Sequence, residues 1–502
     1  AAAGRAAALA MAEVIRRSAG RGATGSVTLA WVTQAEYGNR GLLRLLETHT
    51  PDRLMVMRGA TEPGDDPRGA IGELRTGPIV RDGGVNLPEK WKGLPVQTLM
   101  VPVLFAQTPV ETVDAKDVDA LADRLAAAVG LPALAPLEPG LPTDPAAGLP
   151  PGAPSGAPPG VVGTKGRTAF ESLGALIETY GVSGHEAAVR EQILARLPAW
   201  ATPQVDGKGN VTVTVGAGGK PLLFMAHIDE VGFDITNIAA DGTAAVRSRG
   251  GMYLSVYESH PVVVQTSRGP VHAVLAPRPG YTTAKESQPA ANSLYLYFGT
   301  TSAPETTALG VAVGDSLTVR KTFAPLAGPR ATGRSMDDRA GSAALLLVLQ
   351  QLDPKTVTNQ VTFAWTVEEE TGLAGAAFLA TTMKPDTAFA VDTFVSTDTP
   401  VDIQRLAGAR LGAGAVLRVL DSRTIVPPHI VDRITAIART AKIPLQLGTT
   451  SGGTDAGAFS AGGAMDVGLS WPGRYSHSPV EIIDRRDLDA LVRLIVALAT
   501  SY

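Results

Sequence analysis

The sequence contains no cysteine in its 502 residues. This absence excludes disulfide bonds and every metal site that depends on thiolate ligands. Any metal ion would have to be held by histidine, aspartate or glutamate side chains. A lack of cysteine fits an exported protein, and it fits a heat-adapted cytosolic protein equally well.

The sequence also lacks a surplus of basic residues and any long apolar run. Its 44 Lys and Arg residues are outnumbered by 48 Asp and Glu residues, which gives a formal net charge of -4. This balance provides no electrostatic footprint for nucleic acid, and no apolar run approaches membrane-spanning length. With 44% hydrophobic residues over this length, we expect a soluble chain of at least two domains.

The start of the chain does not have the pattern of a signal peptide. It begins with Ala1 rather than Met, and charged residues such as Arg5 and Glu13 interrupt the opening apolar residues. We expect that an upstream segment has been removed. The missing cysteine, the non-Met start and the linker described next favour an extracytoplasmic or cell-envelope location, with the cytoplasm as the alternative.

A proline-rich linker divides the chain. Ten of the 37 prolines lie between Pro132 and Pro159, interleaved with Gly, Ala and Ser. Such a composition cannot build a packed core and favours an extended, semi-rigid spacer. We therefore predict a linker at residues 131–165, between an N-terminal segment at residues 1–130 and a C-terminal segment at residues 166–502.

The C-terminal segment alternates strand and helix patterns, as in an α/β sheet. The predicted strands are Asn210–Val215, Leu222–Ala226, Val361–Val367 and Thr387–Val391, and the predicted helices are Arg339–Leu352 and Leu488–Leu498. Residues 234–326 instead show short alternating strands rich in Val, Thr, Tyr and Gly. We predict a β-rich insertion there, which splits an α/β domain into residues 166–233 and 327–502.

Polar side chains follow the predicted strands. His227 and Asp229 follow Leu222–Ala226, the pair Glu369 and Glu370 follows Val361–Val367, and Asp392 follows Thr387–Val391; Asp337 and Asp338 precede a helix, and His477 lies near the C-terminus. Ligands of open α/β sheets bind outside the carboxyl ends of the strands, so these side chains can converge on one site. Each alone has an ordinary explanation, such as a helix cap for Asp337 or a solvated face for the glutamates.

Carboxylates and imidazoles in this arrangement suit two divalent ions. A bridging carboxylate holds two ions a few ångströms apart, and a flanking histidine and acid on each side complete two open coordination shells. A neighbouring carboxylate that binds no metal serves as a general base. The adjacent pair Glu369 and Glu370 offers both roles.

The C-terminal segment resembles a known family, the tetrahedral dinuclear aminopeptidases of metallopeptidase family M42. The motifs that carry the resemblance are Ala226–Gly232, Ser335–Gly341, Glu369–Leu373, Ala390–Asp392, Gly452–Ala456 and Tyr475–Pro479, in the order of the family. It extends over about residues 166–502, including the Ser183–Glu186 opening and an inserted β domain. His185 and Glu368 stand where an aromatic residue and Gln are more usual, and neither is a metal ligand in the family.

The resemblance implies a fold, a reaction and a set of roles. The fold is a zinc-peptidase-like three-layer αβα domain with an inserted small β-barrel or PDZ-like domain. The reaction is removal of N-terminal residues from peptides, with two divalent ions per chain, Zn²⁺ first and Co²⁺ or Mn²⁺ as alternatives. His227, Asp337 and Asp392 would hold one ion, and Asp337, Glu370 and His477 the other; Glu369 would be the base, Asp229 would orient His227, and Gly452, Gly453, Thr454, Asp455 and Arg474 would bind substrate.

The N-terminal segment repeats part of this pattern. Val27–Gly38 matches Val361–Gly372 at an offset of 334 residues, but Gln34 and Ala35 replace Glu368 and Glu369. Residues 1–52 align with 335–386 and residues 107–121 with 477–491, so that Ala3, Ala35, Arg58 and Gln107 replace the ligand and base positions, and only Glu36 keeps a ligand type. We predict a degenerate α/β half-copy that cannot hold the dimetal site and serves as a scaffold or assembly module, or is a decayed duplication.

Two further functions share these motifs. One is a structural or envelope assembly protein built from peptidase-like domains, and retention of the base Glu369 argues against it. The other is a related dimetal deacylase or carboxypeptidase, which has the same ligands and a different pocket. Family members associate through the inserted domain and the catalytic domain, so we expect a homo-oligomer, a dimer or larger. We expect the N-terminal segment to limit or redirect growth beyond the dimer.

Overall fold

The computed structural model describes residues 46, 51–60, 79–82, 91–102, 115–128, 169–277, 294–396, 398 and 408–502. The chain divides into two compact units, one of residues 1–164 with 276–285 and one of residues 165–275 with 286–502. The predicted linker and the Val27–Gly38 repeat lie outside the described residues. Within the described part, no helix is both long and apolar enough to cross a bilayer.

The second unit is built on an eleven-stranded sheet in its described part, with the path β13-β14-β20-β19-β16-β6-β15-β5-β4 and with β17 and β18 branching from β19. The four central strands β15, β6, β16 and β19 run parallel. The strands are β4 Gln204–Val205, β5 Val211–Val215, β6 Gly218–His227, β13 Ala324–Pro325, β14 Arg330–Gly333, β15 Asn359–Thr366, β16 Thr387–Val395, β17 Ala415–Leu420, β18 Leu445–Thr449, β19 Met465–Arg474 and β20 Glu481–Asp484.

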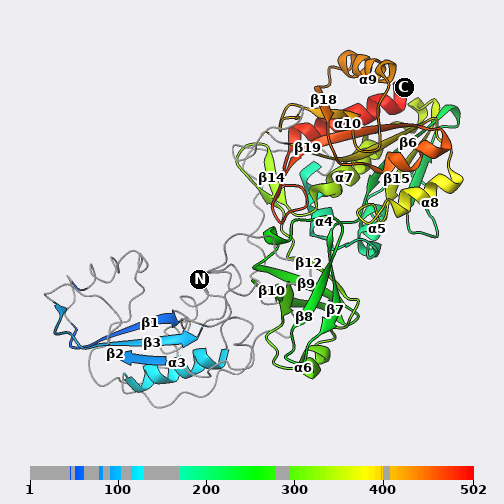
Figure 1. Ribbon diagram of the computed structural model, residues 1–502. Coiled ribbons are helices and arrows are strands. Elements are labelled where there is room, and N and C mark those ends of the chain that lie inside the picture. The colour runs from blue at the N-terminus through cyan, green and yellow to red at the C-terminus, as the bar shows by residue number, and fades with distance from the viewer. Residues whose placement is uncertain are drawn as a thin grey trace. The chain divides into compact units, whose positions relative to one another are not determined.

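Helices cover both faces of this sheet (Figure 1). Side chains alternate between the faces of a strand, and in β6 Leu222 and Phe224 join the core beneath one helical layer while Leu223 and Met225 join the core on the other side. The first layer contains α4 Ala169–Glu178, α5 Ala187–Leu194, α7 Met336–Gln351, α9 Pro428–Thr440 and α10 Arg485–Ser501, and the second contains α8 Ala374–Thr382. The chain therefore has the expected α/β fold.

The helices begin and pack as their sequences dictate. In α10 the Asp484 side chain caps the first turn by accepting from the Arg486 amide, and its apolar face is buried by Leu488, Leu491 and Ile495. In α7 the dihedral angles of Asp337 and Asp338 are not helical. The regular part of α7 thus begins at the predicted Arg339.

The predicted β-rich insertion contains a closed six-stranded barrel in the order β10-β11-β8-β7-β12-β9. Its elements are β7 Gly232–Ile238, β8 Ala244–Arg249, β9 His260–Thr266, β10 Gly269–Leu275, β11 Tyr295–Tyr297, α6 Ala303–Ala308 and β12 Ser316–Val319. Apolar side chains including Phe233, Tyr257 and Leu317 fill a core separate from that of the sheet. Strand β13 at Ala324–Pro325 pairs with β14 and so belongs to the large sheet.

The first unit contains a three-stranded sheet, β1-β3-β2, and one long helix in its described part. Its elements are β1 Leu54–Ala60, β2 Ile79–Asp82, β3 Val96–Pro102 and α3 Ala115–Ala128. Strand β3 is parallel to β1 and antiparallel to β2. In the large sheet β19 is likewise parallel to β16 and antiparallel to β17, and it also pairs antiparallel with β20.

Candidate metal centre

The parallel strands bring the predicted ligands to one edge of the sheet. His227 is the last residue of β6, Glu369 and Glu370 follow β15, Asp392 lies in β16, and His477 follows β19. Asp337, in the first turn of α7, completes two clusters: His227, Asp337 and Asp392 form one, and Asp337, Glu370 and His477 form the other. Within each cluster one ligand atom per residue lies within 4.8 Å of the others.

Asp337 belongs to both clusters, and its two oxygens face different imidazoles. Its Oδ1 lies 3.2 Å from His227 Nε2, and its Oδ2 lies 3.5 Å from His477 Nε2. His477 Nε2 is also 3.2 Å from Glu370 Oε1. Asp337 is therefore the side chain that the two candidate clusters share.

His227 is fully buried between two acids. Its Nε2 faces Asp337, and its Nδ1 lies 3.4 Å from Asp229 Oδ1. Burial lowers the pKa of the imidazole, but the interactions with the carboxylates of Asp229 and Asp337 outweigh burial and raise this pKa well above its usual value. A carboxylate behind the distal nitrogen fixes the tautomer and orientation of a metal-binding imidazole.

Asp229 also fixes the loop after β15, which carries Glu368, Glu369 and Glu370. Its Oδ1 accepts a 3.0 Å hydrogen bond from the Glu369 amide, and its Oδ2 accepts from the Glu370 amide at 3.1 Å and from Ser183 Oγ at 2.7 Å. The sequence motif predicted a role for Asp229 toward His227 alone. One buried carboxylate therefore connects a candidate ligand to the backbone of the candidate base.

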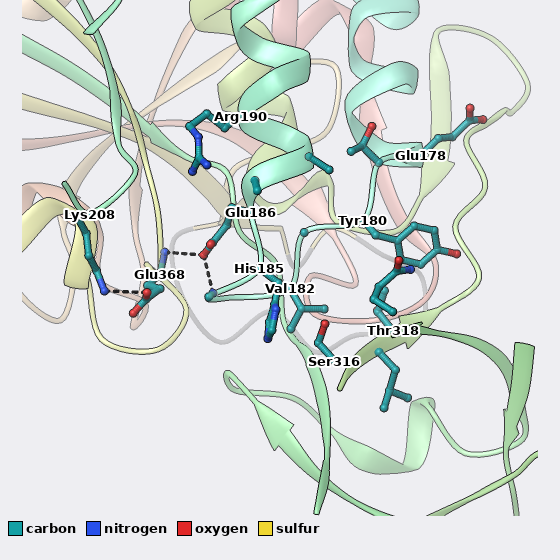
Figure 2. A pocket seen from close by; sticks show the side chains of 17 residues that line it. Glu178, Tyr180, Val182, His185, Glu186, Arg190, Lys208, Ser316, Thr318 and Glu368 are labelled. Atoms are coloured by element: carbon teal, nitrogen blue, oxygen red, sulfur yellow. Dashed lines mark hydrogen bonds and ion pairs between the residues drawn. The ribbon is translucent and has the colours of Figure 1, made fainter. Parts of the chain in front are cut away.

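A second buried carboxylate, Glu186, fixes the start of the same loop (Figure 2). Its Oε1 accepts from the amides of Gly184 at 2.7 Å and Glu368 at 3.1 Å. Burial, reinforced by the nearby charge of Asp229, raises the pKa of Glu186 to about 7. The Ser183–Glu186 motif contained this residue, but nothing in the sequence connected it to a loop about 180 residues away.

Glu186 and Glu368 line a cavity of about 690 Å³ between the α4–α5 region and strands β9 and β12. Figure 2 shows the Glu368 carboxylate turned toward Lys208, and their atoms form a 2.7 Å ion pair. Glu368 has a φ of +52°, a left-handed conformation that is uncommon for a side chain of this size. Surrounding contacts thus hold a strained residue immediately before the candidate base.

The site concentrates buried negative charge. Burial and the carboxylates Asp392, Asp455 and Glu370 raise the pKa of Glu369 well above its usual value, although His227 opposes them. Burial likewise raises the pKa of Asp392 to about 7, opposed by Arg418 at 3.4 Å and assisted by Asp337. Buried carboxylates crowded in this way are stabilised as anions by bound cations. The donor set of acids and imidazoles therefore fits divalent metal ions.

Glu481, which sequence reasoning did not select, connects two candidate ligands. It is fully buried at the start of β20 and accepts from the amides of His477 at 2.9 Å and Asp337 at 3.2 Å. Burial and the charge of Asp337 raise its pKa to about 8. Only the pairing of β20 with β14 and β19 brings this glutamate to the site.

The predicted substrate residues lie in two places. Asp455 and Thr454 are buried; Asp455 Oδ2 accepts from Thr366 Oγ1 at 2.5 Å, while Asp455 Oδ1 and Thr454 Oγ1 have no hydrogen-bond partner in the described part of the chain. The carbonyl oxygens of Gly452 and Gly453 lie 3.4 Å from Arg418. Arg474 instead forms a 2.8 Å ion pair with Asp398.

Known proteins resemble this chain in sequence and structure. A sequence profile described as M42 glutamyl aminopeptidase matches residues 209–494, more than half of the chain. The putative aminopeptidase FrvX of Escherichia coli strain K12 is 30% identical over 340 residues, which cover 66% of this chain and 95% of that protein. A glutamyl aminopeptidase of Lactococcus lactis is 30% identical over 344 residues, which cover 66% of this chain and 96% of that protein.

Solved structures agree with this assignment. A Pyrococcus horikoshii TET1 peptidase, described as assembling into a tetrahedron or a large octahedral shell, has 34% sequence identity and a TM-score of 0.62, covering 67% of this chain and 100% of that one. A TET aminopeptidase from a marine sediment thaumarchaeon has 29% identity and a TM-score of 0.63. Family profile, relatives and fold agree, and the chain belongs to the M42 glutamyl aminopeptidase family of metal-dependent aminopeptidases.

Proposed function

We propose that this metal-dependent aminopeptidase acts through a dimetal centre held by five side chains. His227, Asp337 and Asp392 would hold one divalent ion, and Asp337, Glu370 and His477 the other. The observation that carries the proposal is the placement of Asp337, whose two oxygens lie 3.2 and 3.5 Å from the Nε2 atoms of two different histidines. Two ions per chain follow from this shared carboxylate.

The chemistry divides between the ions and the protein. Bound divalent ions would supply Lewis acidity toward the scissile carbonyl and the attacking water. Glu369 would take a proton from that water and deliver it to the leaving amine. Burial raises the pKa of Glu369, which makes its carboxylate a stronger proton acceptor than an ordinary glutamate and suits the first step. Asp229 would fix the orientation of the His227 ring and the position of the Glu369 backbone.

Zn²⁺ is the proposed ion, with Co²⁺ and Mn²⁺ as alternatives. Two imidazoles and three carboxylates form a donor set of nitrogen and oxygen atoms without sulfur, which suits zinc and also accommodates cobalt and manganese. Hydrolysis of aminoacyl chromogenic substrates after chelation and reloading with each ion would identify the ion. If no ion restored hydrolysis, the proposed chemistry would be wrong.

Glu369→Gln tests the proposed base. This variant should keep its metal content and lose about 10²–10⁴ in kcat, the usual contribution of a general base. Glu368→Gln is the matched control, because the adjacent Glu368 side chain pairs with Lys208. Equal losses in the two variants, or full activity in Glu369→Gln, would remove the base role from Glu369.

The substrate would lie along the segment Gly452–Asp455. Asp455 is buried, contributes to the raised pKa of Glu369, and has one carboxylate oxygen without a partner among the described residues. An unpaired buried oxygen beside the base suits the positively charged amino terminus of a peptide. Arg474 is the least supported of the proposed substrate residues, because Asp398 already pairs with it.

The N-terminal segment is proposed to be a degenerate copy of part of the catalytic domain. Strand β1 pairs with β3 from Leu54↔Val96 onward, and β16 pairs with β19 through Ala388↔Asp466. The offsets are 388 - 54 = 334 and 466 - 96 = 370, the two offsets of the sequence alignment. Helix α3 begins at residue 115 and α10 at residue 485, which also differ by 370.

The antiparallel neighbour supports the same proposal. Arg81 of β2 pairs with Thr98, and Arg418 of β17 pairs with Gly468, so Thr98 and Gly468 are again 370 residues apart. In this register Arg58 occupies the position of Asp392. A basic residue at a ligand position supports a copy that holds no dimetal site. The other replaced positions, Ala3, Ala35 and Gln107, lie outside the described residues.

Assembly is the proposed role of this copy. The TET1 peptidase of Pyrococcus horikoshii is described as forming tetrahedral or octahedral shells, and this chain carries about a third of its length beyond the part that matches it. We infer a homo-oligomer, a dimer or larger, whose growth the N-terminal segment limits. The proposed domain boundaries remain residues 1–130, a linker at 131–165, a catalytic domain at 166–233 and 327–502, and an insertion at 234–326.

A further inference from the structure

The barrel insertion contacts His477, although this residue belongs to the catalytic sheet. His477 Nδ1 lies 2.5 Å from the carbonyl oxygen of Gly251, and the His477 carbonyl accepts a 2.9 Å hydrogen bond from Tyr257 Oη. Gly251 and Tyr257 both lie between strands β8 and β9 of the barrel. A carbonyl oxygen only accepts, so the Nδ1 atom carries a proton, and Nε2, which faces Asp337 and Glu370, is the ring nitrogen available to a metal ion.

His477 needs this support because its backbone is strained. Its φ is +58°, and that of Tyr475 is +60°. Non-glycine residues in this region are strained and persist only where several contacts fix them. Glu481 holds the His477 amide from the sheet, and Tyr257 holds the carbonyl from the barrel. The sheet thus fixes the amide of this strained residue, and the barrel fixes its carbonyl.

Tyr257 is itself held rigidly. The side chain is fully buried, and its ring packs edge-on against Phe233 with ring centres 5.5 Å apart. Its oxygen accepts a 2.8 Å hydrogen bond from Arg334, which leaves the hydroxyl proton for the His477 carbonyl. Arg334 also donates to Thr318 Oγ1 of the barrel at 2.7 Å and to the Val231 carbonyl. The Arg334 guanidinium therefore connects the barrel to the sheet. Arg334 lies three residues before Asp337 in the chain.

The close approach depends on small residues in the barrel segment. Gly250 has a φ of +82°, and a Cβ there would meet Val231 Cγ1 at 2.5 Å and Glu370 Cβ at 3.4 Å. The segment therefore lies against Glu370 as well as His477. These two side chains are the unshared ligands of the same proposed metal position. The contacts described here for His227 and Asp392, which flank the other position, come from the catalytic domain.

We propose that Tyr257 and the Gly251 carbonyl are positioning groups for one of the two metal positions, so that the barrel sets the affinity of the position held by Glu370 and His477. This inference rests on the dimetal assignment above. It gives the insertion a part in the metal centre, in addition to any part in assembly. The position held by His227 and Asp392 is independent of the barrel.

Tyr257→Phe in the full-length protein tests the proposal, because it removes only the hydroxyl and keeps the buried ring. Zn²⁺ titration by calorimetry should give two binding steps in the wild type. In the variant one step should weaken by about 10-fold or more, the range for groups that orient metal ligands, and the other should stay unchanged. Tyr253→Phe is the control, because Tyr253 lies in the same segment and is 71% exposed.

A double-mutant cycle separates positioning from general damage to the fold. Adding Tyr257→Phe to His477→Ala should not weaken the remaining ion further, because the hydroxyl acts through His477. Equal weakening of both steps by Tyr257→Phe, no change in either step, or further loss in the double variant would overturn the inference. A wild type that binds fewer than two ions would instead contradict the dimetal assignment itself.

Discussion

At the residue scale, the centre depends on buried carboxylates whose partners are backbone amides. Asp229 accepts from the amides of Glu369 and Glu370, Glu186 from that of Glu368, and Glu481 from those of Asp337 and His477. These bonds place the ligands and the base before substrate arrives. Preorganisation of this kind is the main contribution that a protein makes to a metal-assisted reaction.

Glu186→Ala should lower kcat by about 10-fold with little change in KM, because it frees the Glu368 amide and loosens the loop that carries Glu369. Glu186→Gln should retain most of the activity, because both amides donate to the single atom Oε1, which glutamine can supply. Steady-state kinetics on the two variants provides the comparison. Equal activity of the alanine variant and the wild type would exclude a positioning role.

The same residue predicts a pH effect on stability. Glu186 has a folded pKa of about 7 against an ordinary value of 4.5, so the folded chain binds this proton more tightly than the unfolded chain. Its stabilising contribution is present below pH 4.5 and is lost as the pH rises through 7. The melting temperature of Glu186→Gln should therefore rise relative to that of the wild type between pH 5 and pH 8, as thermal unfolding would measure. Glu191→Gln, on the exposed side of α5, is the control variant.

The sequence predicted the strands whose ends carry the candidate ligands. Apolar runs predicted the strands that carry His227 and Asp392, and the family motifs selected the residues that the fold brings together. It did not select Glu186, Glu481 or Tyr257. Their contacts depend on loops and strand pairings between distant parts of the chain, and local periodicity contains no information about such pairings.

At the scale of elements, the edge of the sheet that carries the candidate ligands requires close packing of α7 on the sheet. A Cβ on Gly341 would meet the Asp338 carboxylate at 2.2 Å and Val391 Cγ1 at 2.6 Å. Gly341 thus allows the first turn of α7, which carries Asp337, to approach β16. The sequence pattern predicted the helix α7, but it did not define how closely this helix packs on β16.

Gly341→Ala should destabilise the protein by roughly 1–3 kcal/mol, because the overpacking cost exceeds the usual gain of about 1 kcal/mol from replacing a helical glycine. Gly174→Ala in α4 is the comparison. There a Cβ would meet only the edge of the Phe323 ring, at 3.1 Å, and a small ring shift relieves it. Urea unfolding would compare the stability of the two variants, and equal midpoints would contradict the packing argument.

At the scale of the whole molecule, the catalytic and N-terminal parts have different expected roles. The relatives match about two thirds of this chain over nearly their full lengths, so the matched part corresponds to an almost complete peptidase. The short alternating strands between residues 234 and 326 predicted a β-rich insertion, and the family resemblance implied a barrel. Its closure into six strands depends on pairings that periodicity does not define. The roles of the N-terminal segment and the linker remain predictions.

Deletion of residues 1–165 should preserve hydrolysis and change the particle mass. If the N-terminal segment limits growth, light scattering should show larger assemblies for the truncated chain than for the full chain. An unchanged number of chains per particle would remove the assembly role from that segment. Loss of hydrolysis in a truncated chain that is folded and loaded with metal would mean that the segment completes the active site.

The central claim is that Asp337 is shared by two metal positions, and metal content per chain tests it most directly. Elemental analysis of the zinc-loaded full-length protein should give about two ions per chain for the wild type. Asp392→Ala and His477→Ala should each retain one ion, whereas Asp337→Ala should weaken both positions and approach none. One ion in the wild type, or one ion retained by Asp337→Ala, would contradict the dimetal centre.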